Sequence, residues 1–165
     1  MAEIPIKHEG EPQKESTAFP SVLRDTTKVN IEQLMKTPRW RKLEGDEIEH
    51  EKGELQRTAE ELQLAYPTLE RAFDNAQLES LSDADWSLMT NTDSQGTWTK
   101  DDVITHIGSN RDCTKIFGGL ENGDELPAPI VLLRDNEPPY LIGGNTRLLA
   151  CKALKIQPQI LAVRI

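Results

Sequence analysis

The C-terminal part of the chain carries the feature that most restricts the fold, an alternation of apolar runs, turn residues and a helical pattern. Residues 129–133 form an apolar run of strand length, and residues 140–142 form a second one after a proline-rich turn. Such a pair predicts a β-hairpin. After two glycines the apolar residues recur at helical spacing over residues 146–155, and residues 159–163 predict a final strand.

The two glycines form a turn that is suited to binding an anion. Gly143 and Gly144 allow backbone conformations that other residues avoid, and they let a ligand approach closely. Asn145 or Thr146 can cap the following helix. The first N–H groups of a helix lack partners within it and carry the positive end of its dipole, so they attract anions. Arg147 adds a planar group that fits phosphate or carboxylate.

The same turn also has a plainer interpretation, an ordinary connection between a strand and a helix. In that case the glycines serve the turn geometry, and Arg147 is either solvated or paired with Glu137. The pattern is not a Walker A loop, because no Gly-Lys-Ser/Thr follows, and it lacks the GxGxxG of dinucleotide-binding folds. The residues alone leave both interpretations open.

The run PIVLLRDNEPPYLIGGNTRLLACKALKIQPQILAV resembles the core of the ParB/sulfiredoxin superfamily. Members commonly read as strand, turn, strand ending in a Gly-x-x-Arg turn, helix and strand, and the resemblance covers residues 127–164. They include CTP-binding chromosome-segregation proteins, ATP-dependent sulfinic acid reductases, free-serine kinases and nuclease-like proteins. Because the turn binds nucleotide phosphates in that superfamily, the resemblance implies a nucleoside triphosphate (ATP or CTP) with magnesium here. The implied phosphate contacts are Gly143, Gly144, Asn145, Thr146 and Arg147.

Three departures from the family pattern narrow what the resemblance implies. Sulfiredoxins carry a cysteine in the turn, whereas Cys151 lies one helical turn further on, so sulfinic acid reduction is not expected. ParB-type proteins carry an acidic residue where Asn145 stands, and they continue into a helix-turn-helix domain that we do not expect here. Family kinases and nuclease-like members often have a histidine beside the arginine, where this chain has Thr146.

The charge distribution separates the middle of the chain from its C-terminal unit. The net charge of −9 argues against a protein that coats duplex DNA, because phosphate binding needs a basic face. Residues 44–79 hold eleven acidic and three basic side chains, whereas residues 126–165 hold five basic and two acidic ones. An anionic ligand is therefore permitted at the C-terminal unit. No apolar run reaches the roughly 20 residues of a membrane helix, and no signal or transit pattern opens the chain, so we expect a soluble, cytoplasmic protein.

The middle of the chain predicts a series of helices. Residues 1–20 are polar and predict a disordered or loosely packed arm, and residues 21–42 predict an irregular docking segment with a short helix. Apolar residues at helical spacing, bounded by proline, glycine and capping residues, define the other segments. These are a helix over residues 46–65, one from Pro67 to about Leu78, a turn after Ser82 around Trp86 and Met89, a helix from Thr99 to about Gly108, and a short helix over Cys113–Phe117 that Gly118 and Gly119 end.

Several other side chains are candidates for chemistry. Phosphoryl transfer needs a carboxylate to orient the acceptor, and Asp112 and Glu137 are the candidate catalytic carboxylates. Asp112 belongs to the polar segment 109–112, which can equally cap a helix. The three histidines share no spacing typical of a metal site, so no metal ligands are assigned. Of the three, His106 is the best candidate for a titrating group near the turn; its plainer interpretation is a partly exposed histidine on a helix.

The cysteines and tryptophans favour structural roles. Cys113 and Cys151 have no CxxC or metal-like spacing, and we expect reduced, buried thiols. Trp86 and Trp98 flank a loop and are expected to anchor the core, although aromatic side chains in such positions can also stack on a nucleic-acid base.

We therefore predict an α+β fold. In it, an acidic helical portion (residues 21–120) packs on a small mixed β-sheet that includes a ParB/sulfiredoxin-like unit (residues 121–165). The leading functional hypothesis is nucleotide or phosphate binding, extending to ATP-dependent phosphoryl transfer to a small-molecule or protein acceptor. The alternative is a DNA- or partner-binding module without enzymatic activity, or a ParB-like nuclease, that uses the same basic turn. Neither hypothesis requires a membrane.

Overall fold

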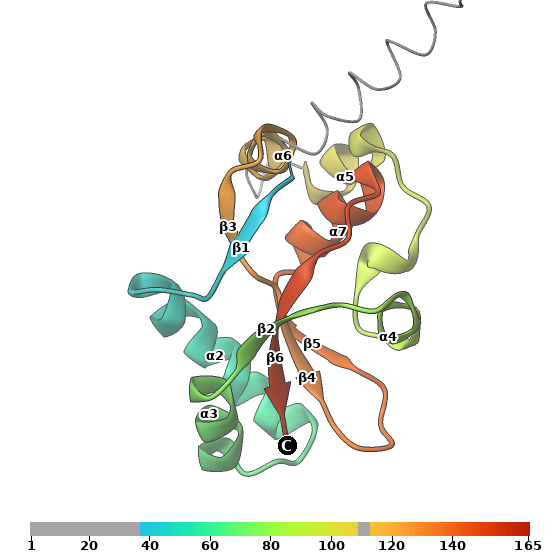
Figure 1. The fold of residues 1–165 in the computed structure, drawn as a ribbon. Helices are drawn as coiled ribbons and strands as arrows, with labels where there is room; N and C mark the ends of the chain where they lie inside the picture. Colours follow the sequence, from blue (N-terminus) through green and yellow to red (C-terminus); the bar gives the residue numbers. More distant parts are fainter. Residues whose placement is uncertain (1–36, 109–112) are drawn as a thin grey trace, which may run out of the picture.

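Four strands form the central sheet in the order β2-β6-β4-β5, and a short parallel pair, β1-β3, lies beside it. The computed structural model describes residues 37–108 and 113–165 and has an α+β fold (Figure 1). The strands are β1 (Arg39–Arg41), β2 (Gln77–Ser80), β3 (Glu125–Pro127), β4 (Ile130–Leu133), β5 (Tyr140–Gly143) and β6 (Gln159–Arg164). The helices are α2 (Asp46–Glu61), α3 (Tyr66–Asp74), α4 (Asp83–Leu88), the 3₁₀ turn η1 (Asp93–Gln95), α5 (Lys100–Ile107), α6 (Cys113–Asn122) and α7 (Asn145–Leu154).

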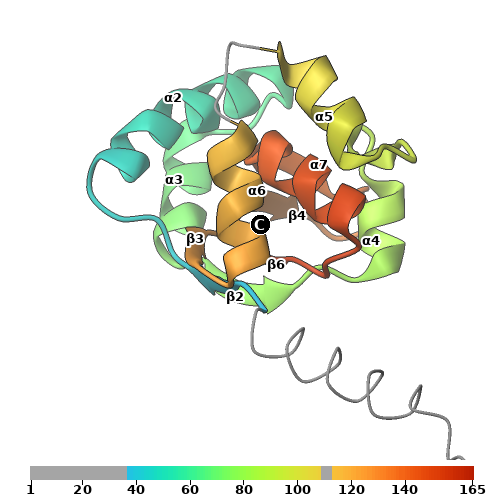
Figure 2. The same ribbon diagram turned by 90° about the horizontal axis from the view of Figure 1, so that it is seen from above.

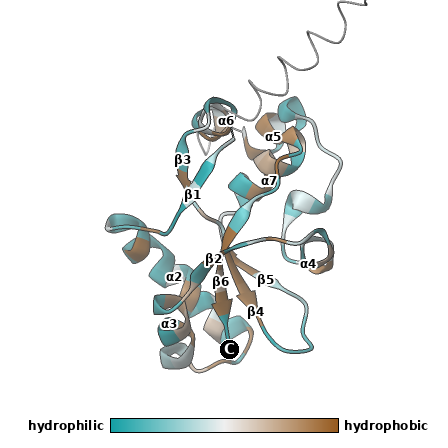
Figure 3. Ribbon diagram, viewed as in Figure 1, coloured by the Kyte–Doolittle hydropathy of each residue, from teal (hydrophilic) through white to brown (hydrophobic). Residues whose placement is uncertain are grey.

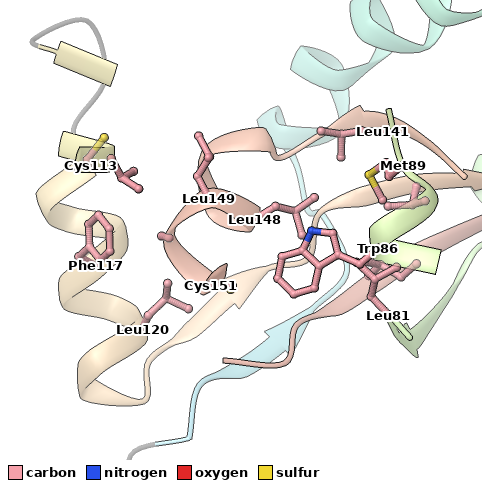
Figure 4. Packing of buried hydrophobic residues seen from close by; sticks show 14 of the residues in the cluster. Leu81, Trp86, Met89, Cys113, Phe117, Leu120, Leu141, Leu148, Leu149 and Cys151 are labelled. Atoms are coloured by element: carbon pink, nitrogen blue, oxygen red, sulfur yellow. The ribbon is translucent and has the colours of Figure 1, made fainter. Parts of the chain in front are cut away.

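Helices cover both faces of the central sheet, which explains why β4 and the middle of β6 are apolar on both faces (Figure 3). Successive side chains of a strand point to opposite faces. Ile130 and Leu132 of β4 pack with α2 and α3, whereas Val131 between them packs with α4, α5, α6 and α7. β6 alternates in the same way. The sheet thus has a hydrophobic core on each face. Figure 4 shows the core on the side of α4, α5, α6 and α7, in which side chains of α6 and α7 face each other.

The predicted hairpin and the elements after it are confirmed. β4 pairs antiparallel with β5, and β6 returns parallel to β4 on its other side. The chain reaches β6 through α7, which lies between α5 and α6 when the molecule is seen from above (Figure 2). The pairing of β4 with β5 is irregular between Ile130 and Val131, directly opposite the end of β5 at Gly143. A bulge at this place bends the strand end where the turn begins.

Two predictions about where helices end are wrong. The second helix ends at Asp74 rather than near Leu78, and residues 77–80 instead form β2, which pairs antiparallel with β6. Gly118 and Gly119 do not end a helix after Phe117, because α6 continues through them to Asn122. A methyl group added at Gly119 would lie 3.1 Å from Cδ2 of Leu126, so close packing of α6 against β3 accounts for this glycine.

Two predicted helix starts in this portion are confirmed. Ser82 caps α4 by accepting a hydrogen bond from the N–H of Asp85, and Thr99 begins α5 in a capping box with Asp102. The prediction that residues 21–42 form an irregular segment is wrong for residues 39–41, which form β1 and pair in parallel with β3. The arm over residues 1–20 and the short helix predicted near residues 29–35 lie outside the described residues. Within residues 37–108 and 113–165, no helix has the length and apolar character needed to cross a membrane.

Candidate functional site

A cleft of about 1070 Å³ opens beside the Gly143–Arg147 turn. One wall is the face of α2, and the opposite wall combines the end of β5, the first turn of α7, the strand β3 and part of α6. The residues of the turn itself all line this cleft: Gly143, Gly144, Asn145, Thr146 and Arg147. The five residues that the sequence assigned to phosphate binding are therefore brought together at one cavity.

Gly144 makes the turn possible and precedes the helix directly. It is the N-cap of α7 and has φ +94°, a left-handed conformation that favours glycine. A methyl group there would lie 2.8 Å from Cα of Pro129, so a larger residue would also collide with the chain before β4. The prediction that Asn145 or Thr146 caps this helix is wrong, because no side chain caps α7 and Asn145 is already its first residue.

The side chain of Asn145 instead holds the turn to a distant segment. Its Oδ1 accepts hydrogen bonds from Oγ1 of Thr92 at 2.7 Å and from the N–H of Asp93 at 3.3 Å. Its Nδ2 donates to Oδ2 of Asp93 at 3.2 Å. These bonds bridge more than 50 residues of sequence, so a long-range contact supplies partners that local capping was expected to provide. Nε2 of His106 lies 3.4 Å from the same Asp93 oxygen, which joins this histidine to the turn indirectly.

Arg147 points from the first turn of α7 toward β3. Its Nη1 donates a hydrogen bond to the backbone oxygen of Pro127 at 2.7 Å. Burial lowers the pKa of Arg147, and the charge of Glu51 on α2 opposes that shift. Arg147 is thus half-buried in the cleft and not paired with Glu137, and its bond to Pro127 keeps a positive charge at the turn.

Glu51 is a buried carboxylate that lies directly against the turn. Its exposed fraction is 8%, and a methyl group added at Gly143 would overlap its Oε2 and lie 3.0 Å from its Cδ. Burial raises the pKa of Glu51, and the nearby charge of Arg147 partly offsets this effect. Among the described residues the side chain of Glu51 forms no hydrogen bond and no ion pair. Buried charges are costly unless they are paired, so such a carboxylate is a candidate functional group.

The other charges of the cleft are largely paired with one another. Arg41 forms two bonds of 2.7 Å with the carboxylate of Glu47. Arg57 is paired with Glu54 and lies 3.9 Å from Glu61. The lining carries five carboxylates (Glu47, Glu51, Glu54, Glu61, Glu125) and four lysine or arginine side chains (Arg41, Arg57, Lys115, Arg147). The cleft as a whole is therefore not basic, and Arg147 is the arginine that stands at the turn.

The structure separates one of the two predicted carboxylates, Glu137, from this cleft. Glu137 is exposed in the β4–β5 turn, at the opposite end of the hairpin from Gly143, because Ile130 at the start of β4 pairs with Gly143 at the end of β5. It does not line the cleft. Asp112, with the rest of the polar segment 109–112, lies outside the described residues. The proposed site therefore includes neither residue.

The cysteines and Trp86 belong to the core, as predicted. Cys113 and Cys151 are both buried and form no disulfide, and burial raises the pKa of Cys151 to about 12. Trp86 is buried, and its Nε1 donates to Oγ of Ser94 at 2.7 Å. His106 is partly exposed on α5. In the described part of the chain, no group of three or more histidine, cysteine, aspartate or glutamate side chains is arranged to hold a metal ion.

Sequence reasoning missed Glu51, although a signal was present. Leu55 and Ala59 define the apolar stripe of the predicted helix over residues 46–65, and Glu51 stands four residues before Leu55. Residues four apart share one helix face, so this glutamate had to point toward the interior. What covers that face is decided by β5 and α7, and no local pattern places them there.

No protein-family model, curated protein or solved structure matches this chain.

Proposed function

We propose that the cleft binds a nucleoside triphosphate, with its phosphates at the first turn of α7. The observation that carries this proposal is the left-handed Gly144 at the N-terminus of α7, which faces a large cleft with Arg147 in the first helical turn. Backbone N–H groups and the helix dipole favour an anion at such a position. The resemblance of residues 127–164 to the ParB/sulfiredoxin superfamily supports the same ligand.

The charges of the cleft favour the magnesium complex over the free nucleotide. With five carboxylates against four lysine or arginine side chains, the lining would repel a bare triphosphate. Mg²⁺ is usually held by one or two carboxylates together with substrate phosphates. Glu51 has the required place, because it lies against Gly143 and has no ion-pair partner among the described residues. We assign it as the protein ligand of a magnesium ion that arrives with the phosphates.

The activity that we propose for this complex is phosphoryl transfer to a hydroxyl group of a small molecule or protein. The hydroxyl oxygen forms a new bond to the terminal phosphorus, the bond to the nucleoside diphosphate breaks, and the hydroxyl proton passes to solvent. Positioning and charge neutralisation do most of the catalysis in such reactions, and Arg147, the helix N-terminus and a Glu51-bound magnesium supply both. Binding of duplex DNA is less well supported, because the cleft lacks a basic surface.

Thermal unfolding with ATP, CTP or GTP, each with and without Mg²⁺, tests the binding proposal. At a concentration about 100 times the dissociation constant, a nucleotide should raise Tm by about 5–10 °C. Arg147→Met should weaken binding roughly 10- to 100-fold through the loss of charge-assisted hydrogen bonds. Arg71→Met on α3 is the matched control, since Arg71 is exposed and outside the cleft. An unchanged Tm with every nucleotide at millimolar concentration would refute the proposal.

Glu51→Gln tests the assignment of magnesium. Removing the carboxylate should strengthen binding of the metal-free nucleotide, because a repulsive charge next to the phosphates is lost. The same change should abolish most of the gain in affinity that Mg²⁺ gives to the unmodified protein. If the gain from Mg²⁺ is equal in both proteins, Glu51 is not a ligand. Release of nucleoside diphosphate, followed with the bound nucleotide at saturation, then tests the proposed transfer separately.

A further inference from the structure

A second cavity, of about 620 Å³, lies at the other end of α7 from the candidate cleft. Its walls are α4, the segment from Gln95 to Lys100, the C-terminal half of α7 and the loop that follows α7. Its volume is in the range of small-molecule sites. The cavity shares no lining residue with the cleft at the Gly143–Arg147 turn.

Two tryptophans give this cavity rigid aromatic walls. The ring of Trp86 is held by its 2.7 Å hydrogen bond to Ser94 and by the surrounding core (Figure 4). The ring of Trp98 lies over Gly96, where an added methyl group would overlap the indole, and it meets the ring of His106 edge-on with centroids 4.2 Å apart. Trp98 is only partly buried. Because both rings are already held in place, a flat ligand would bind without the cost of ordering them.

Positive charge stands at the rim of this cavity. Lys152 lies in the last turn of α7, and Lys155 directly follows the helix as its C-cap. Nζ of Lys152 is 4.6 Å from the centroid of the Trp86 ring. Lys100 also lines the cavity but is paired with Glu121 at 2.7 Å. Across residues 37–108 and 113–165, neither Lys152 nor Lys155 forms an ion pair with a carboxylate.

The charges that line this cavity favour a negatively charged ligand. The lining holds three lysines and a single carboxylate, Asp83, in a chain whose net charge is −9. Acidic groups elsewhere outnumber basic ones, so two lysines without an ion-pair partner among the described residues are a local exception. A ligand with a negative group at the rim and an apolar, flat body would satisfy both features.

We infer that this cavity is a second binding site, for a small aromatic carboxylate. The aromatic ring packs beside Trp98, and the carboxylate accepts hydrogen bonds from the ammonium groups of Lys152 and Lys155. This site is separate from the proposed nucleotide site and does not depend on it.

The test uses 2-naphthoate as the probe and 2-naphthylmethylamine as the partner of equal size and opposite charge. The protein has three tryptophans, Trp40, Trp86 and Trp98, so ¹⁵N NMR yields three indole N–H signals that single substitutions can assign. Naphthoate should shift the Trp98 signal and leave that of Trp40, which lies in β1 outside this cavity. The amine should bind far more weakly. An unmoved Trp98 signal, or equal binding of the amine, would overturn the inference.

Lysine substitutions distinguish naphthoate binding in this cavity from nonspecific binding of anions to the protein surface. Lys152→Met combined with Lys155→Met should weaken naphthoate binding at least about tenfold, because charge-assisted hydrogen bonds are lost. The matched control removes two exposed or half-exposed lysines elsewhere, Lys42→Met with Lys52→Met, and should leave the affinity unchanged. Trp98→Leu is the second variant and should also weaken binding. If both lysine pairs behave alike, the cavity does not select the ligand.

Discussion

The pair Glu51 and Arg147 allows a test of the site that needs no ligand. Glu51 is buried, and its pKa responds to the charge of Arg147. We compare the unmodified protein with Glu51→Gln, with Arg147→Met and with the double variant in a double-mutant cycle. The cycle isolates the interaction between the two side chains, because effects of each single change appear twice and cancel. The lost bond from Arg147 to Pro127, about 1–3 kcal/mol, is one such effect.

The size of the coupling follows from the geometry. In the described part of the chain, Glu51 and Arg147 form no ion pair within 4.0 Å. For two charges beyond that distance, an effective dielectric constant of about 20 limits the attraction to about 4 kcal/mol. Measured couplings between neighbouring residues are about 0.5–3 kcal/mol. We therefore expect the unfolding free energies to give a coupling of about 1–2 kcal/mol at neutral pH.

The coupling should depend on pH in a defined direction. Burial raises the pKa of Glu51 above its ordinary value of 4.5, so the folded protein holds this proton more tightly than the unfolded chain. The contribution of Glu51 to stability is then full below its unfolded pKa of 4.5 and is lost as pH rises through the folded pKa. Glu51→Gln escapes this loss and should be more stable than the unmodified protein at pH 8. Arg147→Met should increase this loss of stability at high pH, because the charge that lowers the pKa of Glu51 is gone.

Urea unfolding followed by tryptophan fluorescence, at pH 4 and pH 8, measures all four proteins. The coupling should be present at pH 8 and nearly absent at pH 4, where Glu51 is neutral. Glu49→Gln is the control, because Glu49 is exposed on the same helix. The reasoning fails if Glu51→Gln is less stable than the unmodified protein at pH 8, or if the coupling is the same at both pH values.

Three further predictions concern the scaffold of the two sites. Asn145→Ala removes the bonds to Thr92 and its neighbour, so it should cost about 1–3 kcal/mol and speed amide hydrogen exchange in the first turn of α7; unchanged exchange would contradict the role given to this side chain. Thr99→Ala removes the capping box of α5 and should cost about 1 kcal/mol in urea unfolding, whereas Thr99→Ser should cost less. Because the pKa of Cys151 is about 12 and Cys113 is also buried, neither thiol should react with a disulfide reagent at pH 8 until the protein opens, and rapid labelling of the native protein would contradict this.

Local chemistry made several elements predictable. Thr99 and Asp102 stand three residues apart, so the capping box of α5 is encoded within one helical turn. The hairpin of β4 and β5 needs only two apolar runs and the turn between them. In contrast, β2 was missed because its strand character depends on β6, which begins almost 80 residues later. A four-residue strand of mixed polarity has no signal of its own, and pairing with a distant partner decides it.

The candidate site also combines features that the local sequence determines with features that depend on distant parts of the chain. By itself, the sequence determined the turn: two glycines between a strand and a helix, followed by Arg147, because these properties are local to five residues. It also determined that Glu51 shares a helix face with Leu55. Only the tertiary structure decided that this face lies against Gly143, that Asn145 binds Thr92 rather than capping its own helix, and that Glu137 lies at the far end of the hairpin. The physical reason is that a buried charge and a long-range hydrogen bond depend on partners brought together by packing, which spacing along the chain does not encode.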